Sequence, residues 1–113
     1  MANDCLFCRI VRKEIPAKIA AEDEHCIAFR DINPQAPVHI LVIPREHVAS
    51  LNELDEPMMV GHMHRMAAEL AKSEKLAERG YRTVINTNAD AGQTVFHIHL
   101  HLLGGRPMTW PPG

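Results

Sequence analysis

The stretch that decides the fold is residues 95–103, which read Val-Phe-His-Ile-His-Leu-His-Leu-Leu. Side chains of a strand alternate between its two faces, so His97, His99 and His101 would share one face. The apolar residues between them would share the other face and pack on a core. Three imidazoles on one face pack poorly and repel one another once protonated. The pattern therefore predicts a strand that carries a functional site.

The triplet alone leaves two kinds of chemistry open, because histidines spaced two apart on a strand also occur in zinc sites. The preceding segment, residues 86–94, reads Asn-Thr-Asn-Ala-Asp-Ala-Gly-Gln-Thr. Gly92 allows the backbone to approach a ligand closely, and successive N–H groups there could bind an anion. Gln93 and Thr94 add side-chain hydrogen-bonding groups. Beside the histidines, this segment is interpreted as a flexible turn that binds phosphate.

The rest of the chain predicts an α+β fold in a single domain, residues 1–113. No repeated strand–helix alternation is present, so we expect an antiparallel sheet of about five strands with one long and one short helix. The short helix would span residues 5–12 with Asp4 as its cap, and the long helix would begin after Asp55 and end by Gly80. The strands are expected over residues 18–22, 26–30, 39–44, 82–86 and 95–103.

Apolar residues at helical spacing predict the buried helix faces. Leu6 and Ile10 share one face of the short helix. The long helix carries a core stripe made of Met59, Met63, Met66, Leu70 and Ala77.

Composition narrows the classes of partner. The chain has 12 Lys and Arg against 14 Asp and Glu, a formal charge of -2, so no basic surface predicts nucleic-acid binding. Residues 1–10 lack a sustained apolar run and predict neither a secretory signal nor a membrane span. Three cysteines without a signal favour reduced thiols or a metal site in a cytoplasmic protein.

The triplet His97-Ile-His99-Leu-His101-Leu-Leu resembles the signature of the histidine triad (HIT) superfamily, in which histidines alternate with apolar residues. Further stretches are similar to its histidine triad nucleotide-binding (Hint) branch, the adenosine phosphoramidases. They are RKEIPAK at 12–18, AFRDI at 28–32, PQAP at 34–37, LVIP at 41–44, AGQT at 91–94 and WPPG at 110–113. The nucleotidyltransferase branch has Gln in place of His101, and the dinucleoside polyphosphate hydrolases lack the WPPG ending.

The resemblance implies a HIT-like fold and hydrolysis of purine nucleoside 5′-phosphoramidates of the adenosine type, without a cofactor for catalysis. His99 would attack the α-phosphorus, giving a nucleotidyl-histidine intermediate that water hydrolyses to nucleoside monophosphate. His101 and Thr94 would assist at the phosphate, and His39 would orient the triad. The alternatives are a metal-dependent hydrolase, a nucleotide-binding regulatory or interaction protein, and a dinucleoside polyphosphate hydrolase.

The resemblance also implies the contacts of a purine nucleotide of the AMP or GMP type. Asp31 would accept the ribose hydroxyls and Ile32 would face the base. The tail would cross to the partner in a homodimer, where Trp110 would border the neighbour's site. The phosphate side would be formed by Asn86, Gly92, Gln93, Thr94, His99 and His101. Thr94 stands where the family commonly has Ser.

A second site is implied by Cys5-x-x-Cys8, a spacing suited to zinc. Some relatives with this early cysteine pair hold a structural zinc, and the matching ligands here would be Cys5, Cys8, His47 and His97. Inert reduced thiols and a redox pair are the alternatives.

Overall fold

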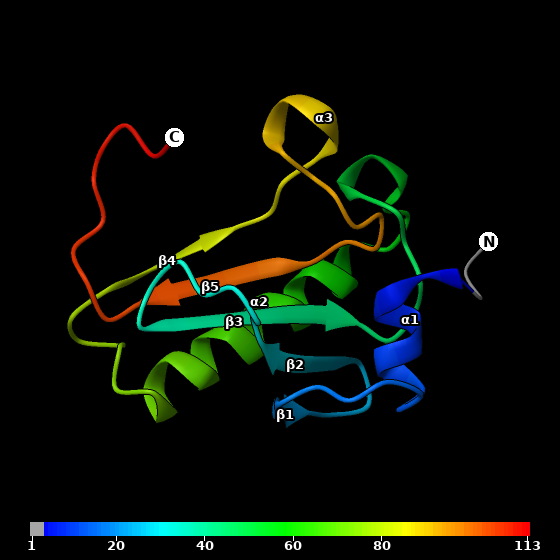
Figure 1. Cartoon of the computed structure of the whole chain (residues 1–113), viewed down its shortest axis with the longest axis horizontal. Helices are drawn as coiled ribbons and strands as arrows, with labels where there is room; N and C mark the ends of the chain where they lie inside the picture. The colour runs from blue at the N-terminus through cyan, green and yellow to red at the C-terminus, as the bar shows by residue number, and fades with distance from the viewer. Residues whose placement is uncertain (1–3) are drawn as a thin grey trace.

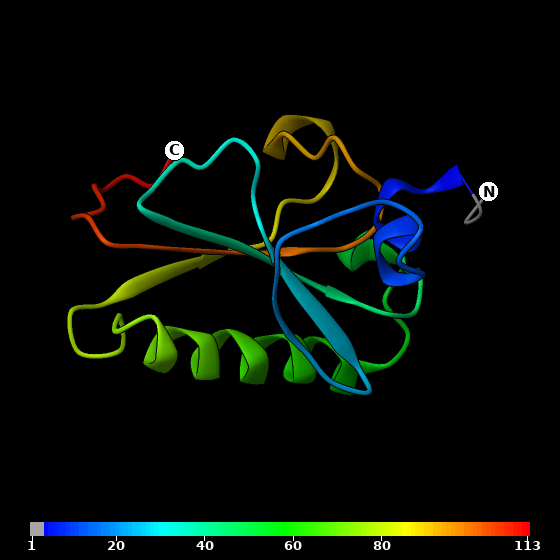
Figure 2. The same ribbon diagram turned by 60° about the horizontal axis from the view of Figure 1, so that its bottom comes forward.

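A five-stranded antiparallel sheet forms the centre of the computed structural model, which describes residues 4–113 (Figures 1 and 2). The strand order is β1-β2-β3-β5-β4, and each neighbouring pair is antiparallel. The strands are β1 (Ile19–Glu22), β2 (Cys26–Arg30), β3 (Val38–Pro44), β4 (Tyr81–Val84) and β5 (Leu100–Gly104). The expected α+β class with five antiparallel strands is confirmed.

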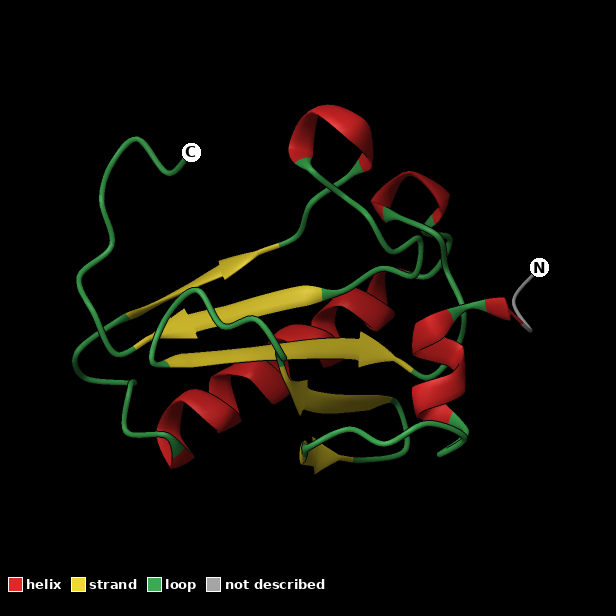
Figure 3. Ribbon diagram, viewed as in Figure 1, coloured by secondary structure: helices red, strands yellow, loops and turns green. Residues whose placement is uncertain are grey.

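Helices and loops lie on both sides of this sheet (Figure 3). We expected two helices, but the described residues also form a third α-helix and a 3₁₀ helix. These elements are α1 (Leu6–Val11), η2 (Leu51–Glu53), α2 (Pro57–Ser73) and α3 (Asn88–Ala91). Within residues 4–113, no helix combines the length and apolar character needed to cross a membrane.

Alternation along β3 and β5 separates two apolar clusters. Ile40 and Val42 on β3 face α2 together with Leu100 and Leu102 on β5. The opposite face of β3 carries Leu41 and Ile43, which pack with β2 and the short helix α1. In Figure 2, α2 runs along one face of the sheet, and α3, the loop before β3 and the C-terminal tail lie on the other side. Residues on that other side, His39 and His101 among them, are available for a site.

The long helix is shorter than expected. Its cap is Glu56, whose side chain accepts from the Met58 N–H, and not Asp55. It ends at Ser73. The N–H groups of Glu74 and Leu76 donate to the carbonyls of Leu70 and Ala71, and Lys75 has φ 63°. The chain leaves the helix axis there and not near Gly80.

The buried stripe of α2 is confirmed from Met59, which is half-buried against the core, to Leu70. Met63, Met66 and Leu70 are buried against the sheet. Ala77 is exposed beyond the end of the helix, and Leu76 fills the core in its place.

The short helix differs in its cap and its buried face. The Cys5 Sγ accepts from the Cys8 N–H at 3.5 Å, so Cys5 caps the helix in place of Asp4. Ile10 is buried as expected, but Leu6 is 47% exposed and Phe7 packs against the sheet. Capping by Cys5 brings the sulfur atoms of both cysteines to the same end of α1.

The histidine triplet does not lie on one continuous strand. The expected strand over residues 95–103 is paired only from Leu100, because its ladder with β3 ends at the pair Val42–Leu100. Before that point, Ile98 makes a single backbone bond to the Val48 carbonyl. Phe96, expected in the core, is 50% exposed. The turn expected over residues 86–94 contains α3, and the expected strand over 82–86 is β4.

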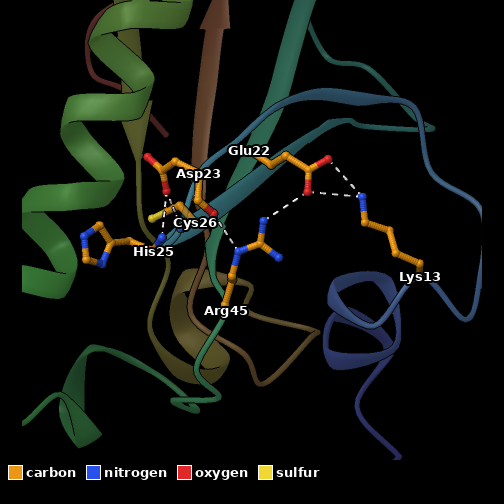
Figure 4. A network of polar contacts seen from close by, with 6 residues as sticks. All are labelled: Lys13, Glu22, Asp23, His25, Cys26 and Arg45. Atoms are coloured by element: carbon orange, nitrogen blue, oxygen red, sulfur yellow. Dashed lines mark hydrogen bonds and ion pairs between the residues drawn. The ribbon is translucent and has the colours of Figure 1, made fainter.

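A polar network holds the end of β3 to the turn between β1 and β2 (Figure 4). Glu22 accepts from Lys13 at 2.9 Å and from Arg45 at 3.0 Å. The Arg45 Nε donates to the Asp23 carbonyl, and the Asp23 carboxylate accepts from the N–H groups of His25 and Cys26. Arg45 follows Pro44, so the network fixes the position of the Pro44 carbonyl.

Candidate active site

The three predicted catalytic histidines lie together on the sheet face opposite α2. His39 belongs to β3, His101 belongs to β5, and His99 directly precedes β5. The ring centroid of His101 lies 5.2 Å from that of His39 and 5.1 Å from that of His99. His39 and His99 are buried, and the edge-to-face ring of Phe7 from α1 covers His99 at 5.1 Å.

A backbone carbonyl orients the ring of His99. Its Nδ1 lies 2.8 Å from the carbonyl oxygen of His97. A carbonyl only accepts hydrogen bonds, so Nδ1 must carry the proton and donate it. In the neutral ring this leaves a lone pair on Nε2. Burial is the main cause that lowers the pKa of His99, so the neutral form prevails near pH 7.

A backbone N–H sets the tautomers of His39 and His101 by the same logic. The Gln35 N–H donates to Nδ1 of His39 at 3.0 Å, so the His39 proton is on Nε2. That Nε2–H donates to Nδ1 of His101 at 2.9 Å. His101 must then carry its own proton on Nε2. The relay therefore ends in an N–H donor on the ring next to His99.

Burial keeps this histidine pair neutral. Burial, followed by the neighbouring His99 and His39, lowers the pKa of His101 to about 4, whereas Asp31 opposes the shift. Burial also lowers the pKa of His39. The Asp31 Oδ2 lies 3.4 Å from the His39 Nε2, and its Oδ1 accepts from the Asn33 N–H at 2.8 Å. Asp31 therefore both stabilises its loop and contacts the relay.

The segment before the triplet is more ordered than expected. Gly92 caps α3 with φ 83°, a left-handed conformation that favours glycine. The buried side chain of Gln93 accepts from the Asn88 N–H and donates to the carbonyls of Ala49 and Val95. Its amide is thus used inside the protein and shapes the loop. Thr94 is exposed and Asn86 is half-buried.

Ile32 and Trp110 are exposed apolar side chains, and Trp110 is 81% exposed. The Arg82 guanidinium lies 5.9 Å from the Trp110 ring centroid and donates to the Thr109 carbonyl. In the part of the chain that the structure describes, no ring contact joins Trp110 to the histidines. Its place beside a neighbour's site stays a prediction.

A second cluster brings together the four residues of the expected metal site. The Nδ1 of His97 lies 3.5 Å from Sγ of Cys5, 3.5 Å from Sγ of Cys8 and 3.2 Å from Nδ1 of His47. The Cys8 Sγ lies 3.3 Å from the same His47 nitrogen. All four donor atoms are within 4.8 Å of one another.

The ring of His97 is oriented toward this cluster and away from His99. Its Nε2 donates to the Pro44 carbonyl at 2.8 Å, so Nδ1 keeps a lone pair. Burial lowers the pKa of His97 to about 4. The backbone carbonyl of the same residue holds His99. The triad therefore divides between two sites.

Sequence reasoning missed three contributors, namely Phe7, Pro44 and Gln35. Pro44 and Gln35 act through backbone atoms, and the identity of a residue does not indicate such a role. The stretch PQAP at 34–37 pointed to the right loop without indicating that the Gln35 N–H orients His39.

Comparisons with known proteins identify the family of this chain. A family model described as HIT domain matches residues 12–108. An uncharacterized HIT-like protein of Synechococcus elongatus is 53% identical over the full length of both chains. The purine nucleoside phosphoramidase of Escherichia coli is 47% identical over 96% of this chain and 92% of that protein. The crystal structure of a HIT family hydrolase from Legionella pneumophila is 52% identical with a TM-score of 0.95, covering 97% of this chain and 100% of that one. The expected HIT-like fold is thereby confirmed.

Burial of neutral histidines predicts a loss of stability in acid. An unfolded histidine has a pKa near ~6.5, whereas the pKa of folded His101 is about 4. The unfolded chain takes up this proton first, so the contribution of His101 is complete above about pH 6.5 and is lost as the pH falls toward 4.

In urea unfolding, a change from pH 7 to pH 5 should lower the free energy of unfolding of the wild type more than that of His101→Gln. The difference should be about 1 kcal/mol after allowance for solvent screening. Equal losses in the two proteins would contradict a half-buried, neutral His101.

Proposed function

Because the chain belongs to the HIT domain family, we propose that it hydrolyses purine nucleoside 5′-phosphoramidates of the adenosine type to nucleoside monophosphate and amine. The observation that carries this proposal is the hydrogen bond from Nδ1 of His99 to the His97 carbonyl, which leaves a lone pair on Nε2. The E. coli relative named purine nucleoside phosphoramidase supports the same reaction class.

In the first step, Nε2 of His99 attacks the α-phosphorus and the phosphorus–nitrogen bond to the amine breaks. The bonding electron pair leaves with the amine nitrogen, which must gain a proton because an amide anion is a poor leaving group. The Nε2–H of His101 transfers this proton to the amine, and its vacated Nε2 is free to take up the proton of the attacking water in the second step. The product of this step is a nucleotidyl-imidazole on His99.

In the second step, water attacks the phosphorus and the bond to Nε2 of His99 breaks. The imidazole recovers its lone pair, and the water proton returns to the histidine relay. Because His39 is held by a backbone N–H, the relay returns to its starting tautomers after each turnover. The nucleoside monophosphate is then released.

The nucleotide would bind along the loops on this face of the sheet. Asp31 and Ile32 are proposed for the ribose and base, as the resemblance implies. The exposed hydroxyl of Thr94 is available to the phosphate, whereas the N–H groups of Gly92 and Gln93 already donate to the carbonyls of Ala89 and Asn88. Gln93 would act by shaping this loop, because its amide is already hydrogen-bonded.

A metal-dependent hydrolase that uses the triad as ligands is the weaker alternative. That chemistry requires the three imidazoles to offer lone pairs to one ion. Here the Nδ1 of His97 faces the cysteine cluster, and the Nδ1 of His99 donates to a carbonyl. A nucleotide-binding module without catalysis is the other alternative, and it predicts no release of AMP.

We further propose that the second cluster binds a structural zinc ion. A tetrahedral zinc site with two thiolates and two imidazoles has edges of roughly 3.3 Å between nitrogens and roughly 3.6 Å between nitrogen and sulfur, from ordinary bond lengths. The observed distances of 3.2 Å and of 3.3 to 3.5 Å fit this donor set. The bond from His97 to the Pro44 carbonyl is the outer contact that a zinc-bound histidine usually makes. Zinc there would cross-link α1 to the segment before β5.

Substitution of the nucleophile should abolish turnover. His99→Ala should reduce hydrolysis of adenosine 5′-phosphoramidate by about 10³-fold or more, because no other group can form the covalent bond. The control is His64→Ala, an exposed histidine on α2 at the opposite face, which should keep wild-type activity. The readout is steady-state release of AMP with and without a chelator. Full activity of His99→Ala would refute the proposal.

Metal content tests the zinc proposal separately. Protein purified without added zinc should contain about one zinc ion per chain, and Cys8→Ala should lose it because one thiolate ligand is removed. Cys26→Ala is the matched control, since Cys26 is a buried cysteine in the other apolar cluster. A metal-free wild type with intact thiols, by elemental analysis and thiol titration, would refute the site.

A further inference from the structure

The loop between β2 and β3, residues 31–37, is largely exposed, yet one of its backbone N–H groups orients a histidine of the candidate site. It has no regular secondary structure, and Gln35 itself is exposed. Yet the Gln35 N–H determines which nitrogen of His39 carries the proton, and through His39 the tautomer of His101. Exposed loops with few buried contacts fluctuate easily. Hydrogen bonds within the loop, from the Asn33 N–H to Asp31 and from the Gln35 side chain to the Asn33 carbonyl, leave the Gln35 carbonyl itself to be held from outside the loop.

Arg106, at the start of the C-terminal tail, supplies this restraint. Its Nε and Nη2 both donate to the carbonyl oxygen of Gln35, at 3.2 and 3.0 Å. Its Nη1 donates to the Pro107 carbonyl at 3.0 Å, so each guanidinium nitrogen holds a backbone oxygen. A planar guanidinium that donates two hydrogen bonds to one acceptor holds it more rigidly than an ammonium can.

The backbone next to Arg106 is shaped for this contact. Gly105 has φ 92°, a conformation that side chains rarely adopt. A Cβ at this position would lie 2.9 Å from Cβ of Pro37. A glycine is therefore needed for the tail to approach the loop, and this approach brings the guanidinium to Gln35.

We propose that Arg106 is a positioning residue for the histidine relay: by holding the Gln35 carbonyl it keeps the Gln35 N–H on His39 and the donor proton on Nε2 of His101. The N–H and the carbonyl flank the same α-carbon, so the guanidinium limits rotation about the bonds that aim the N–H. The proposal rests on the proposed function, because it treats His101 as the proton donor.

Loss of the guanidinium changes the proton arrangement and not only the loop. When the Gln35 N–H turns away, Nδ1 of His39 is free to carry the proton. Nε2 of His39 then becomes an acceptor, and His101 must donate from Nδ1 to keep the contact. The Nε2 of His101 is left with a lone pair in place of its N–H. Catalysis loses the donor, while the nucleophile and the nucleotide contacts are retained.

The test uses the full-length protein as wild type, Arg106→Met, Arg106→Lys and Arg65→Met. Arg65 is an exposed arginine on α2 and serves as the control for loss of one positive charge. The first readout is the ¹⁵N chemical shift of each ring nitrogen of His39 and His101. The wild type and Arg65→Met should show both rings protonated at Nε2. Arg106→Met should show a second population protonated at Nδ1, and Arg106→Lys a smaller one.

The second readout is kcat and KM for adenosine 5′-phosphoramidate. In Arg106→Met, kcat should fall by about tenfold, which is less than the roughly 10²- to 10⁴-fold cost of losing a general acid altogether. KM should change less than kcat, and Arg106→Lys should recover part of the lost rate. Arg65→Met should match the wild type.

Wild-type tautomers in Arg106→Met, or a fall in kcat without a tautomer change, would overturn the proposal. If Arg106→Met does not fold, Arg106→Lys decides by the same two readouts. A wild type that lacks phosphoramidase activity would refute the proposed function alone, since the ring-nitrogen shifts would still decide whether Arg106 positions the relay.

Discussion

A neutral imidazole has one N–H and one lone pair, and in this protein backbone groups decide where each of them lies. The His97 carbonyl accepts the hydrogen bond of the His99 Nδ1–H, and the Gln35 N–H donates to the lone pair on Nδ1 of His39. These two contacts leave a lone pair on Nε2 of His99 and an N–H donor on Nε2 of His101. Both features depend on burial as well, because water would otherwise exchange the tautomers and protonate the rings. The chemistry therefore depends on how the backbone is held around the triad.

His97 connects the two sites through different parts of the same residue. Its ring faces Cys5, Cys8 and His47, and its carbonyl holds His99. The position of its ring depends on the Pro44 carbonyl, which the Arg45 network secures at the end of β3. An ion held by this cluster would therefore stabilise His97, whose carbonyl orients His99, without taking part in the reaction.

The sequence predicted what side-chain type and spacing determine. Alternation around Leu100 and Leu102 identified the core face of the central strand, and the Cys5–Cys8 spacing identified the second cluster. Features that depend on backbone pairing could not be predicted from the sequence. The strand begins at Leu100 because its partner ladder ends at Val42. The roles of backbone atoms in Gln35 and Pro44, and the internal use of the Gln93 amide, depend on distant contacts that no local pattern encodes.

The central claim is that Nε2 of His99 forms a covalent bond to phosphorus, and rapid-quench trapping tests it most directly. Enzyme and excess adenosine 5′-phosphoramidate are mixed, quenched in alkaline denaturant to preserve phosphorus–imidazole bonds, and digested for peptide mass spectrometry. An adenylyl adduct on His99 that forms and decays fast enough to account for turnover is predicted. Turnover with the adduct on another residue, or an adduct on His99 too slow to be an intermediate, would contradict the claim.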